Sequence, residues 1–253
     1  MTPWHKELVH RTHDIPYEKL IVTGNGIDLR RFSQKAKKIP NSFIYSSSPD
    51  RSLEVVLRLF PKIRAVLPDA SLHIYYGFDN WDKSIARTGN AAQGEIRDRI
   101  LQLMQQEGVH YHGRVNQSEL AAAFGASDIW LYPTQFTETY CITALEAQAA
   151  GTLCICSDLA GLSTTVGDRG ILIKKDPNDP GYDEYIIDLL RDIQNDPQRK
   201  QAIITQARLW AEEQTWDHIA GRWADIFAAS AEVDNGGIQE QTAQLQQRVI
   251  QIF

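Results

Sequence analysis

Residues 128–157 read DIWLYPTQFTETYCITALEAQAAGTLCICS, and this stretch decides the fold class. Two short apolar runs, at 128–133 and 152–157, enclose a segment with the composition of a helix, which ends at Gly151. Apolar strands of this length that alternate with helices are typical of βαβ units, in which helices bury both faces of a parallel sheet. The segment 137–151 is therefore predicted to be a crossover helix between two parallel strands.

The same alternation extends to both sides of this stretch. We predict six strands and, with them, an α/β fold: one Rossmann-like parallel sheet with helices on both faces. Pro61 lies inside the first predicted helix and is expected to kink or break it. Residues 78–90 are interpreted as a polar stretch. The predicted strands are 42–48, 70–77, 109–113, 128–133, 152–157 and 170–175, and the main helices between them are 51–68, 95–108, 116–127 and 137–151.

The ends of the chain differ from this core. Residues 1–19 are polar and short of apolar pattern, so they are interpreted as a lead-in rather than a domain. Residues 20–230 are predicted to form the Rossmann-like domain, whose last part, after residue 182, consists of C-terminal helices. Residues 234–237, DNGG, are predicted to be a flexible break. Residues 231–253 are predicted to be a C-terminal helical tail.

Composition excludes several classes of protein. The 253 residues have a formal net charge of −6, so no basic excess favours nucleic acid as a partner. Cys141, Cys154 and Cys156 lack the number and spacing of a disulfide framework or zinc site, and are expected to be reduced and packed as small apolar residues. We find no signal peptide and no apolar run of the ~18 residues that a membrane span needs, so the cytoplasm is the expected compartment.

The clearest candidate functional residues follow the strand at 128–133. Glu138 and Glu146 form an E-x7-E spacing, and carboxylates accept paired hydrogen bonds from vicinal hydroxyls such as those of sugars and riboses. The backbone N–H groups of Thr139, Tyr140 and Cys141 are expected to open a helix, where a phosphate binds. The ordinary alternative is a first-turn glutamate and a solvated glutamate. However, Glu146 has apolar neighbours, so its charge needs a partner.

Other strand ends carry weaker signals. Arg51 follows the serines Ser46 to Ser48 and could clamp a diphosphate, although a surface arginine in a serine-rich turn is equally ordinary. The backbone at Arg114 could read a nucleobase edge. His110 and His112 alternate along one strand; a metal pair is one reading, but hydrogen-bonded core histidines are commoner and no third ligand is evident. We find no D-x-D motif, and TGNGID at 23–28 reads as a turn, since it matches no phosphate-loop pattern.

The order of these motifs resembles the retaining glycosyltransferases of the GT-B fold, the glycogen-synthase-like group 1 type. The resemblance runs from about residue 20 to residue 230 and rests on three segments. Two of its forms also look like a bacterial subgroup associated with surface-polysaccharide synthesis. The segments are KLIVTGNGIDLRRF, SSSPDRSLE and HYHGRVNQSELAAAFGASDIWLYPTQFTETYCITALEAQAAGTLCICSD.

The resemblance implies a role for each matching residue. Glu138 matches the glutamate that contacts the donor sugar, and Glu146 the one that holds the ribose hydroxyls. Residues 139–141 match the phosphate-binding turn, and Arg51 stands where the family usually has a lysine for the diphosphate. Glu138 and Arg51 are thus the catalytic candidates. The substrate-binding candidates are Glu146, Thr139, Tyr140, Cys141, Ser47 and Arg114.

This sequence also departs from the family pattern. Ser47 replaces an arginine, so one phosphate contact is missing or supplied elsewhere, and Thr139 replaces a glycine, which alters how the backbone approaches the phosphate. A complete GT-B enzyme has two Rossmann domains, and only the donor-binding half is seen here. Residues 1–19 resemble the end of the other half. We therefore expect a nucleotide-sugar donor and a separate acceptor-binding domain or subunit as partners, with no metal and no cofactor implied.

Two rival interpretations remain. The first is a non-catalytic interaction or regulatory module derived from a glycosyltransferase, which an exposed apolar surface near residues 1–20 and 238–253 would favour. The second is a sugar-phosphate enzyme such as a non-hydrolysing epimerase, which would need acid and base residues within the domain. The sequence shows no such constellation, so the epimerase ranks last.

Overall fold

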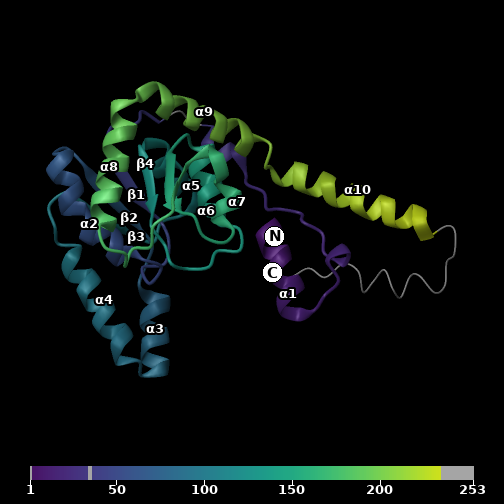
Figure 1. The fold of residues 1–253 in the computed structure, drawn as a ribbon, viewed down its shortest axis with the longest axis horizontal. Helices are drawn as coiled ribbons and strands as arrows, with labels where there is room; N and C mark the ends of the chain where they lie inside the picture. Colours follow the sequence, from purple (N-terminus) through teal and green to yellow (C-terminus); the bar gives the residue numbers. More distant parts are fainter. Residues whose placement is uncertain (1, 34–35, 235–253) are drawn as a thin grey trace.

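The structure, a computed structural model, describes residues 2–33 and 36–234, with side chains to residue 229 (Figure 1). In this part of the chain six parallel strands form one sheet in the order β3-β2-β1-β4-β5-β6. The predicted Rossmann-like α/β fold is therefore confirmed, and each predicted strand contains an observed one. The strands are β1 (Ser42–Tyr45), β2 (Ser71–Tyr75), β3 (Val109–Gly113), β4 (Ile129–Tyr132), β5 (Leu153–Ser157) and β6 (Ile171–Ile173).

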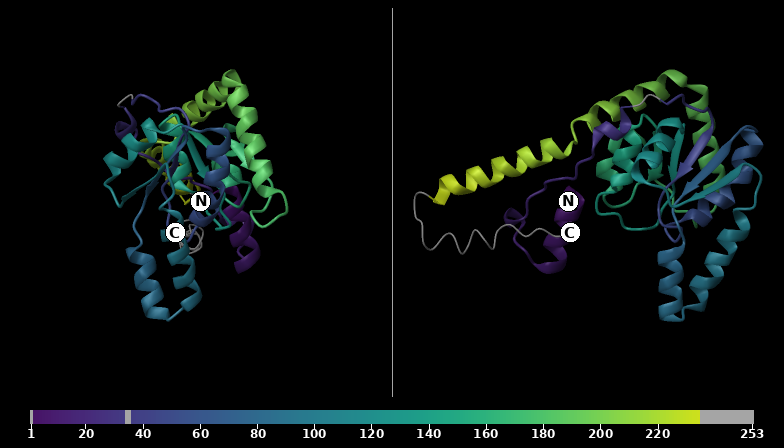
Figure 2. Two further views of the ribbon diagram at one scale, coloured as in Figure 1. Left: turned by 90° about the vertical axis from the view of Figure 1, so that its left-hand side faces the viewer. Right: turned by 180° about the vertical axis from the view of Figure 1, so that it is seen from behind.

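Burial explains why the central strands read as continuous apolar runs. Every residue of β1, β4 and β5 is buried, because helices cover both faces of the sheet there. Helices α2 and α8 pack against each other on one face, and α5 and α6 lie on the other (Figure 2). The bounds are α2 (Leu53–Val66), α4 (Ala91–Leu103), α5 (Gln117–Ala126), α6 (Ile142–Ala149), α7 (Leu162–Thr165), η3 (Gly167–Arg169), α8 (Tyr182–Asn195) and α9 (Pro197–Glu212).

The sequence predicts that Pro61 kinks or breaks its helix, and of these two outcomes the break does not occur in α2. The helix continues from Leu53 to Val66 with Pro61 inside it. A proline lacks the N–H that would bond the carbonyl four residues earlier, here that of Leu57. The side chain of Gln106 supplies the missing donor, since its Nε2 lies 3.1 Å from the Leu57 oxygen. A partner 49 residues away thus offsets part of the cost of Pro61.

Helix α3 (Asp79–Thr88) occupies the stretch interpreted as merely polar. It buries a single side chain, Trp81, so its sequence lacks the long apolar stripe that signals a helix. It instead pairs with α4: Trp81 Nε1 donates to Gln93 Oε1 at 2.8 Å, and Arg97 Nε lies 2.9 Å from Asp82 Oδ1. Together α3 and α4 project below the sheet as a helical hairpin (Figure 1).

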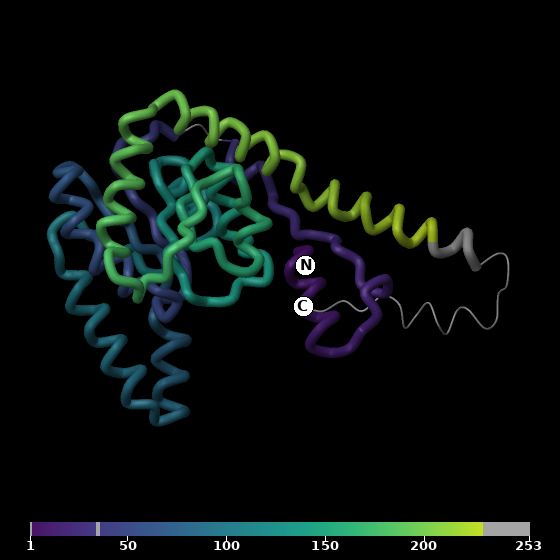
Figure 3. The backbone as a smooth tube through the Cα atoms, viewed as in Figure 1, coloured from purple at the N-terminus to yellow at the C-terminus, as the bar shows by residue number. Residues whose placement is uncertain are grey.

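Residues before β1 form a chain that runs outside the sheet. It contains α1 (Pro3–His13), η1 (Tyr17–Lys19) and η2 (Leu29–Phe32). Residues 20–33 pass beside the junction of α9 and α10 (Trp216–Asp234), where Ile27 forms a parallel bridge with Thr215 (Figure 3). The predicted lead-in therefore includes a helix. Of the helical tail predicted at 231–253, residues 231–234 belong to α10, and residues 235–253 lie outside the described residues.

Candidate active site at the carboxyl edge of the sheet

The loops after β1 and β4 meet at the carboxyl edge of the sheet. Arg51, from the first loop, points its Nη1 at Glu138 Oε1 of the second, 3.0 Å away. The arginine side chain is 34% exposed and the glutamate side chain 12% exposed. The arginine also lies over the ring of Phe136, 3.8 Å from its centroid. The structure thus brings together the two residues predicted to be catalytic, from positions 87 residues apart.

Two tyrosines at the strand ends support this ion pair. Tyr132 donates its hydroxyl to Glu138 Oε1 at 2.8 Å, and Ser47 Oγ lies 3.3 Å from the same hydroxyl. Burial raises the pKa of Tyr132 well above its ordinary value, so this hydroxyl keeps its proton and acts as a donor. Tyr45 donates to the carbonyl of Arg51 at 3.0 Å, which fixes the loop that carries the arginine.

The backbone turn at 139–141 precedes helix α6 rather than opening it. The helix begins at Ile142, and Cys141 is its N-cap in a left-handed conformation with φ of 68°. This backbone is uncommon for a residue with a side chain and costs on the order of 1–3 kcal/mol. A hydrogen bond from α7 holds the turn in place: Thr165 Oγ1 donates to the Tyr140 carbonyl at 2.5 Å. The N–H groups of a first helical turn lack acceptors within the helix.

Gly161, in the loop after β5, packs against the same turn. Its N–H donates to the Glu138 carbonyl at 2.8 Å, and a Cβ at this position would come within 2.6 Å of the Thr139 carbonyl carbon. Only glycine allows so close an approach of two backbones. Thr139 itself is exposed, and its carbonyl accepts a hydrogen bond from Thr2 Oγ1 at 2.9 Å. The loop after β5 therefore fixes the position of Glu138 and Thr139.

Glu146 has the charged partner that its apolar surroundings require. Arg31 Nη2, from η2, lies 2.9 Å from Glu146 Oε1, and the two side chains are 17% and 13% exposed respectively. Burial raises the pKa of Glu146, while the nearby Arg31 charge opposes that rise. The two glutamates of the E-x7-E spacing thus have different arginines as partners.

Arg114 is placed elsewhere on this edge. Its side chain is exposed, and its guanidinium lies 5.7 Å from the centroid of Tyr76, just past the end of the neighbouring strand. Neither Glu138 nor Arg51 is among the residues that Arg114 contacts in the described part of the chain. The role predicted for it, near a nucleobase, stays a prediction.

The histidines of β3 are not core residues, contrary to the commoner reading. His110 and His112 are exposed, and His73 of β2 lies between them. His73 Nδ1 is 3.0 Å from His112 Nε2. Burial, followed by the charges of the two neighbours, lowers the pKa of His73 to about 4. Across residues 2–33 and 36–234, no group of three or more His, Cys, Asp or Glu side chains is placed to hold a metal ion.

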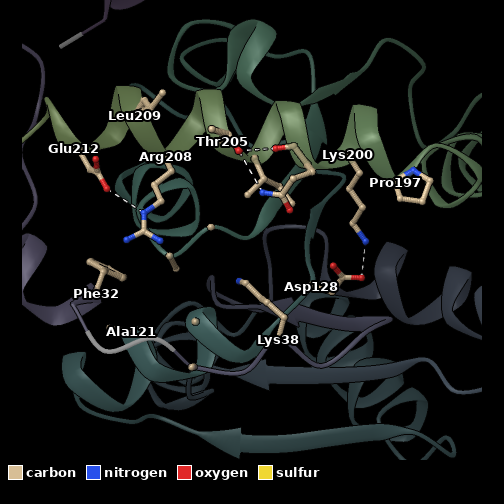
Figure 4. A pocket seen from close by; sticks show the side chains of 16 residues that line it. Phe32, Lys38, Ala121, Asp128, Pro197, Lys200, Thr205, Arg208, Leu209 and Glu212 are labelled. Atoms are coloured by element: carbon tan, nitrogen blue, oxygen red, sulfur yellow. Dashed lines mark hydrogen bonds and ion pairs between the residues drawn. The ribbon is translucent and has the colours of Figure 1, made fainter.

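A cavity of about 730 Å³ lies at the opposite edge of the sheet (Figure 4). It opens between α9 and the amino ends of β4 and β5. Lys200 crosses part of it to Asp128, with Nζ 2.7 Å from Oδ2. At the carboxyl edge a smaller hollow of about 400 Å³ is framed by the ends of β4, β5 and β6. Cavity size alone would thus direct attention away from Glu138 and Arg51.

The three cysteines are buried and free, as expected. Burial raises the pKa of each thiol, which keeps the thiols protonated and unreactive. Among the helices described, none is long and apolar enough to span a bilayer.

Comparison with known proteins identifies the family. Residues 19–210 match the family described as glycosyl transferases group 1. The chain belongs to the group 1 glycosyltransferases. Its glycosyltransferase relatives include a D-inositol 3-phosphate glycosyltransferase of Jonesia denitrificans, 30% identical over 51% of this chain and 30% of the relative. A phosphatidyl-myo-inositol mannosyltransferase of Mycolicibacterium smegmatis is 25% identical over 77% of this chain and 45% of the relative. The chain thus spans less than half the length of these two relatives.

Solved glycosyltransferase structures share the fold. A sucrose-phosphate synthase of Thermosynechococcus elongatus superposes with a TM-score of 0.69 at 18% identity, covering 92% of this chain and 58% of that one. The Anabaena protein HepE in complex with UDP and glucose gives a TM-score of 0.59 at 15% identity, covering 81% and 55%. At these identities the likeness concerns the fold.

Several residues of the site were not anticipated from sequence. Tyr132 is the last residue of a buried strand, so its sequence context signals only a core position. Arg31 gave a partial signal, because it follows the NGID segment of the family resemblance and Glu146 needed a cation. Gly161 and Phe136 gave none, because their contacts exist only in the folded loop cluster.

Proposed function

We propose that this chain is the donor-binding domain of a glycosyltransferase that transfers a sugar, with retention of configuration, from a nucleotide-diphosphate sugar to an acceptor. The observation that carries the proposal is the Arg51–Glu138 pair beside the turn before α6. It combines a cation for a diphosphate with a carboxylate for sugar hydroxyls, and a sugar diphosphate carries both groups next to each other.

Each part of the site has a distinct task in this proposal. A guanidinium has five N–H donors, so Arg51 can bind phosphate oxygens while it keeps its contact with Glu138. The backbone N–H groups of residues 139–141 and the positive end of α6 stabilise the negative charge that develops on the departing diphosphate. Glu138 positions the donor sugar. Glu146, half-buried beside Arg31, accepts hydrogen bonds from the ribose.

The structure suggests how the site works without the family's arginine at position 47. Ser47 stands where relatives of this type have an arginine, and its hydroxyl contacts Tyr132, which in turn holds Glu138. The position thus supports the sugar-binding carboxylate instead of adding a second phosphate cation. Arg51 is consequently the cation of this loop that binds the diphosphate, and its substitution should weaken donor binding strongly.

The acceptor is expected to bind to a separate domain or subunit. A role in surface-polysaccharide synthesis and a cytoplasmic location are also part of the proposal.

A second candidate function is a non-catalytic interaction module. The observation that favours it is exposed apolar surface in the first 22 residues, where Leu8, Tyr17, Ile21 and Val22 are 39–42% exposed. Such a surface fits a protein partner. It fits an acceptor-binding domain equally well, so donor binding decides between the two functions.

The test is a calorimetric and thermal-shift screen of the purified chain. UDP-, GDP- and ADP-sugars and their free nucleotides are titrated into wild type, Glu146→Ala and Glu138→Ala. We expect one nucleotide family to stabilise the chain. Glu146→Ala should weaken nucleotide binding, and Glu138→Ala should reduce the advantage of the sugar nucleotide over the free nucleotide. If wild type and both variants respond equally, the site is refuted; if no nucleotide binds, the interaction module takes first place.

A further inference from the structure

The Arg31–Glu146 pair is built from a segment outside the sheet. Arg31 belongs to η2, a turn of four residues, whose start is capped by Asp28 accepting from the N–H of Arg30 at 3.1 Å. Phe32, next to Arg31, is 9% exposed and packs in the cluster that includes Leu145 of α6. The guanidinium is therefore delivered to α6 by a packed element and not by a free surface chain.

The pair is not arranged for stability alone. Arg31 Nε is buried and has no hydrogen-bond partner among the described residues. A buried ion pair with an unsatisfied donor is generally no more stabilising than apolar residues of the same size. The contact uses Oε1 of Glu146. An ionised carboxylate offers about two acceptor sites on each oxygen, so Glu146 has acceptor capacity beyond its contact with Arg31.

We propose that Arg31 is a positioning residue that fixes Glu146 through Oε1 so that the remaining oxygen can accept hydrogen bonds from the ribose hydroxyls of the donor nucleotide. This inference rests on the proposed function, which assigns Glu146 to the ribose. Arg31 does not touch the nucleotide. Its guanidinium charge keeps the half-buried carboxylate in the acceptor form, since burial alone favours the protonated acid.

The chain offers a matched control one residue away. Arg30 is 91% exposed at its side chain and pairs with Asp28 through Nε at 2.8 Å. Arg30→Met removes the same functional group from the same turn without touching α6. Arg31→Met keeps the length of the aliphatic stem and removes the charge, and Arg31→Lys restores a charge without the planar fork.

The experiment is calorimetric titration with UDP, GDP and ADP and their 2′-deoxy forms, between pH 6 and pH 9. For the nucleotide that binds wild type, we expect a preference of about ten-fold for the ribose form, the usual effect of one hydrogen bond to a charged group. Arg31→Met should lose most of this preference at the low end of the pH range and recover part of it as the pH rises, because a higher pH favours the ionised carboxylate that burial disfavours. Arg31→Lys should be intermediate, and Arg30→Met should match wild type.

Three outcomes would overturn the inference. Arg31→Met could keep the full ribose preference, or it could lose affinity for the ribose and deoxyribose forms equally, which would indicate a structural role. Alternatively, wild type could bind a nucleotide with no ribose preference. The proposed function fails separately, if wild type binds none of the nucleotides. If Arg31→Met does not fold, Arg31→Lys decides by the same ratio of ribose to deoxyribose affinity.

Discussion

The two edges of the sheet carry charged side chains in opposite arrangements. At the amino edge, Lys38 donates to three acceptors, the carbonyls of Phe124 and Ser127 and the hydroxyl of Thr152, at 2.7–3.1 Å. At the carboxyl edge, Arg51 is a third exposed. The first arrangement uses all three donors of the ammonium group, whereas a guanidinium that meets one carboxylate has donors to spare.

Strained backbone is more frequent at the carboxyl edge. Ser52, Cys141 and Ala160, in its loops, have positive φ angles of 75°, 68° and 54°, whereas the amino edge has Asn41 at 58°, a residue type that tolerates this conformation. Strain of this kind persists only where surrounding structure enforces it, and it concentrates at binding sites. The larger cavity is at the amino edge. The comparison therefore teaches that spare hydrogen-bonding capacity and enforced strain indicate the site better than cavity volume does.

The largest effect is expected at the amino edge, on stability alone. Asp128 accepts from the N–H of Asn41 at 3.1 Å and pairs with Lys200 at 2.7 Å, with both charged side chains under 15% exposed. Asp128→Ala leaves a buried cation unpaired and should lower the free energy of unfolding by about 3–5 kcal/mol. Urea denaturation measures the loss. Nucleotide affinity, measured on the folded variant, should stay within about two-fold of wild type.

The control for Asp128→Ala is Asp188→Ala, which removes an exposed pair with Arg191 in α8. Such pairs contribute about 0–1 kcal/mol. If Asp128→Ala loses nucleotide affinity under conditions in which it is fully folded, the distinction between the two edges fails.

The next effect is expected at the carboxyl edge, mainly on binding. Arg51→Met should weaken the binding of a nucleoside diphosphate by about 10–100-fold, because a charge-assisted contact with phosphate is lost. The unfolding temperature should fall less than in Asp128→Ala, because Glu138 keeps its hydrogen bond from Tyr132. Arg99→Met, which removes the exposed α4 partner of Glu54, is the matched control. Equal nucleotide affinity in wild type and Arg51→Met would remove Arg51 from the site.

A smaller effect distinguishes sugar from nucleotide. Glu138→Gln keeps the shape of the side chain and removes its charge, so affinity for the free nucleotide should hold while the extra affinity of the sugar nucleotide falls about ten-fold. Competition calorimetry with both ligands measures the ratio. Glu54→Gln, which also loses an arginine partner, should leave the ratio unchanged. If Glu138→Gln weakens both ligands alike, the carboxylate has no specific contact with the sugar.

The last effect is a pH dependence at the amino edge. Burial lowers the pKa of Lys38 from 10.5 to about 8. Between these values the unfolded chain binds more protons than the folded one, so this lysine makes stability rise with pH, by at most about 1.4 kcal/mol per pH unit. The difference in unfolding free energy between wild type and Lys38→Met should therefore grow from pH 8 to pH 10. A difference that is constant or shrinks would contradict the burial of a charged Lys38, and nucleotide affinity should not follow it.

Local patterns predicted the sheet well because its central strands, β1, β4 and β5, are short, buried and mostly apolar. Glu138 and Arg51 could also be placed at one edge, since the carboxyl ends of parallel strands meet there. The same reasoning failed for Pro61, whose lost hydrogen bond is replaced by Gln106, and for α3, which has one buried side chain. Partners distant in sequence leave no local pattern.

The pairing inside the site was predictable only in part. The need of Glu146 for a cation followed from its apolar neighbours, but the identity of Arg31 depends on how η2 crosses α6. Likewise, the histidines of β3 were misjudged as core residues, because the pattern of one strand does not reveal that β3 lies at the edge of the sheet, where His110, Tyr111 and His112 are exposed. The exposed stack of His73, His110 and His112 is a property of the two strands together.

Hydrogen exchange with and without the bound nucleotide sugar tests the central claim most directly. The account predicts that the ligand slows amide exchange in the two carboxyl-edge segments, residues 46–53 and 134–147, and leaves residues 121–128 and 197–212 around the larger cavity unchanged. Protection confined to 121–128 and 197–212 would contradict it, because the donor would then bind at the amino edge of the sheet.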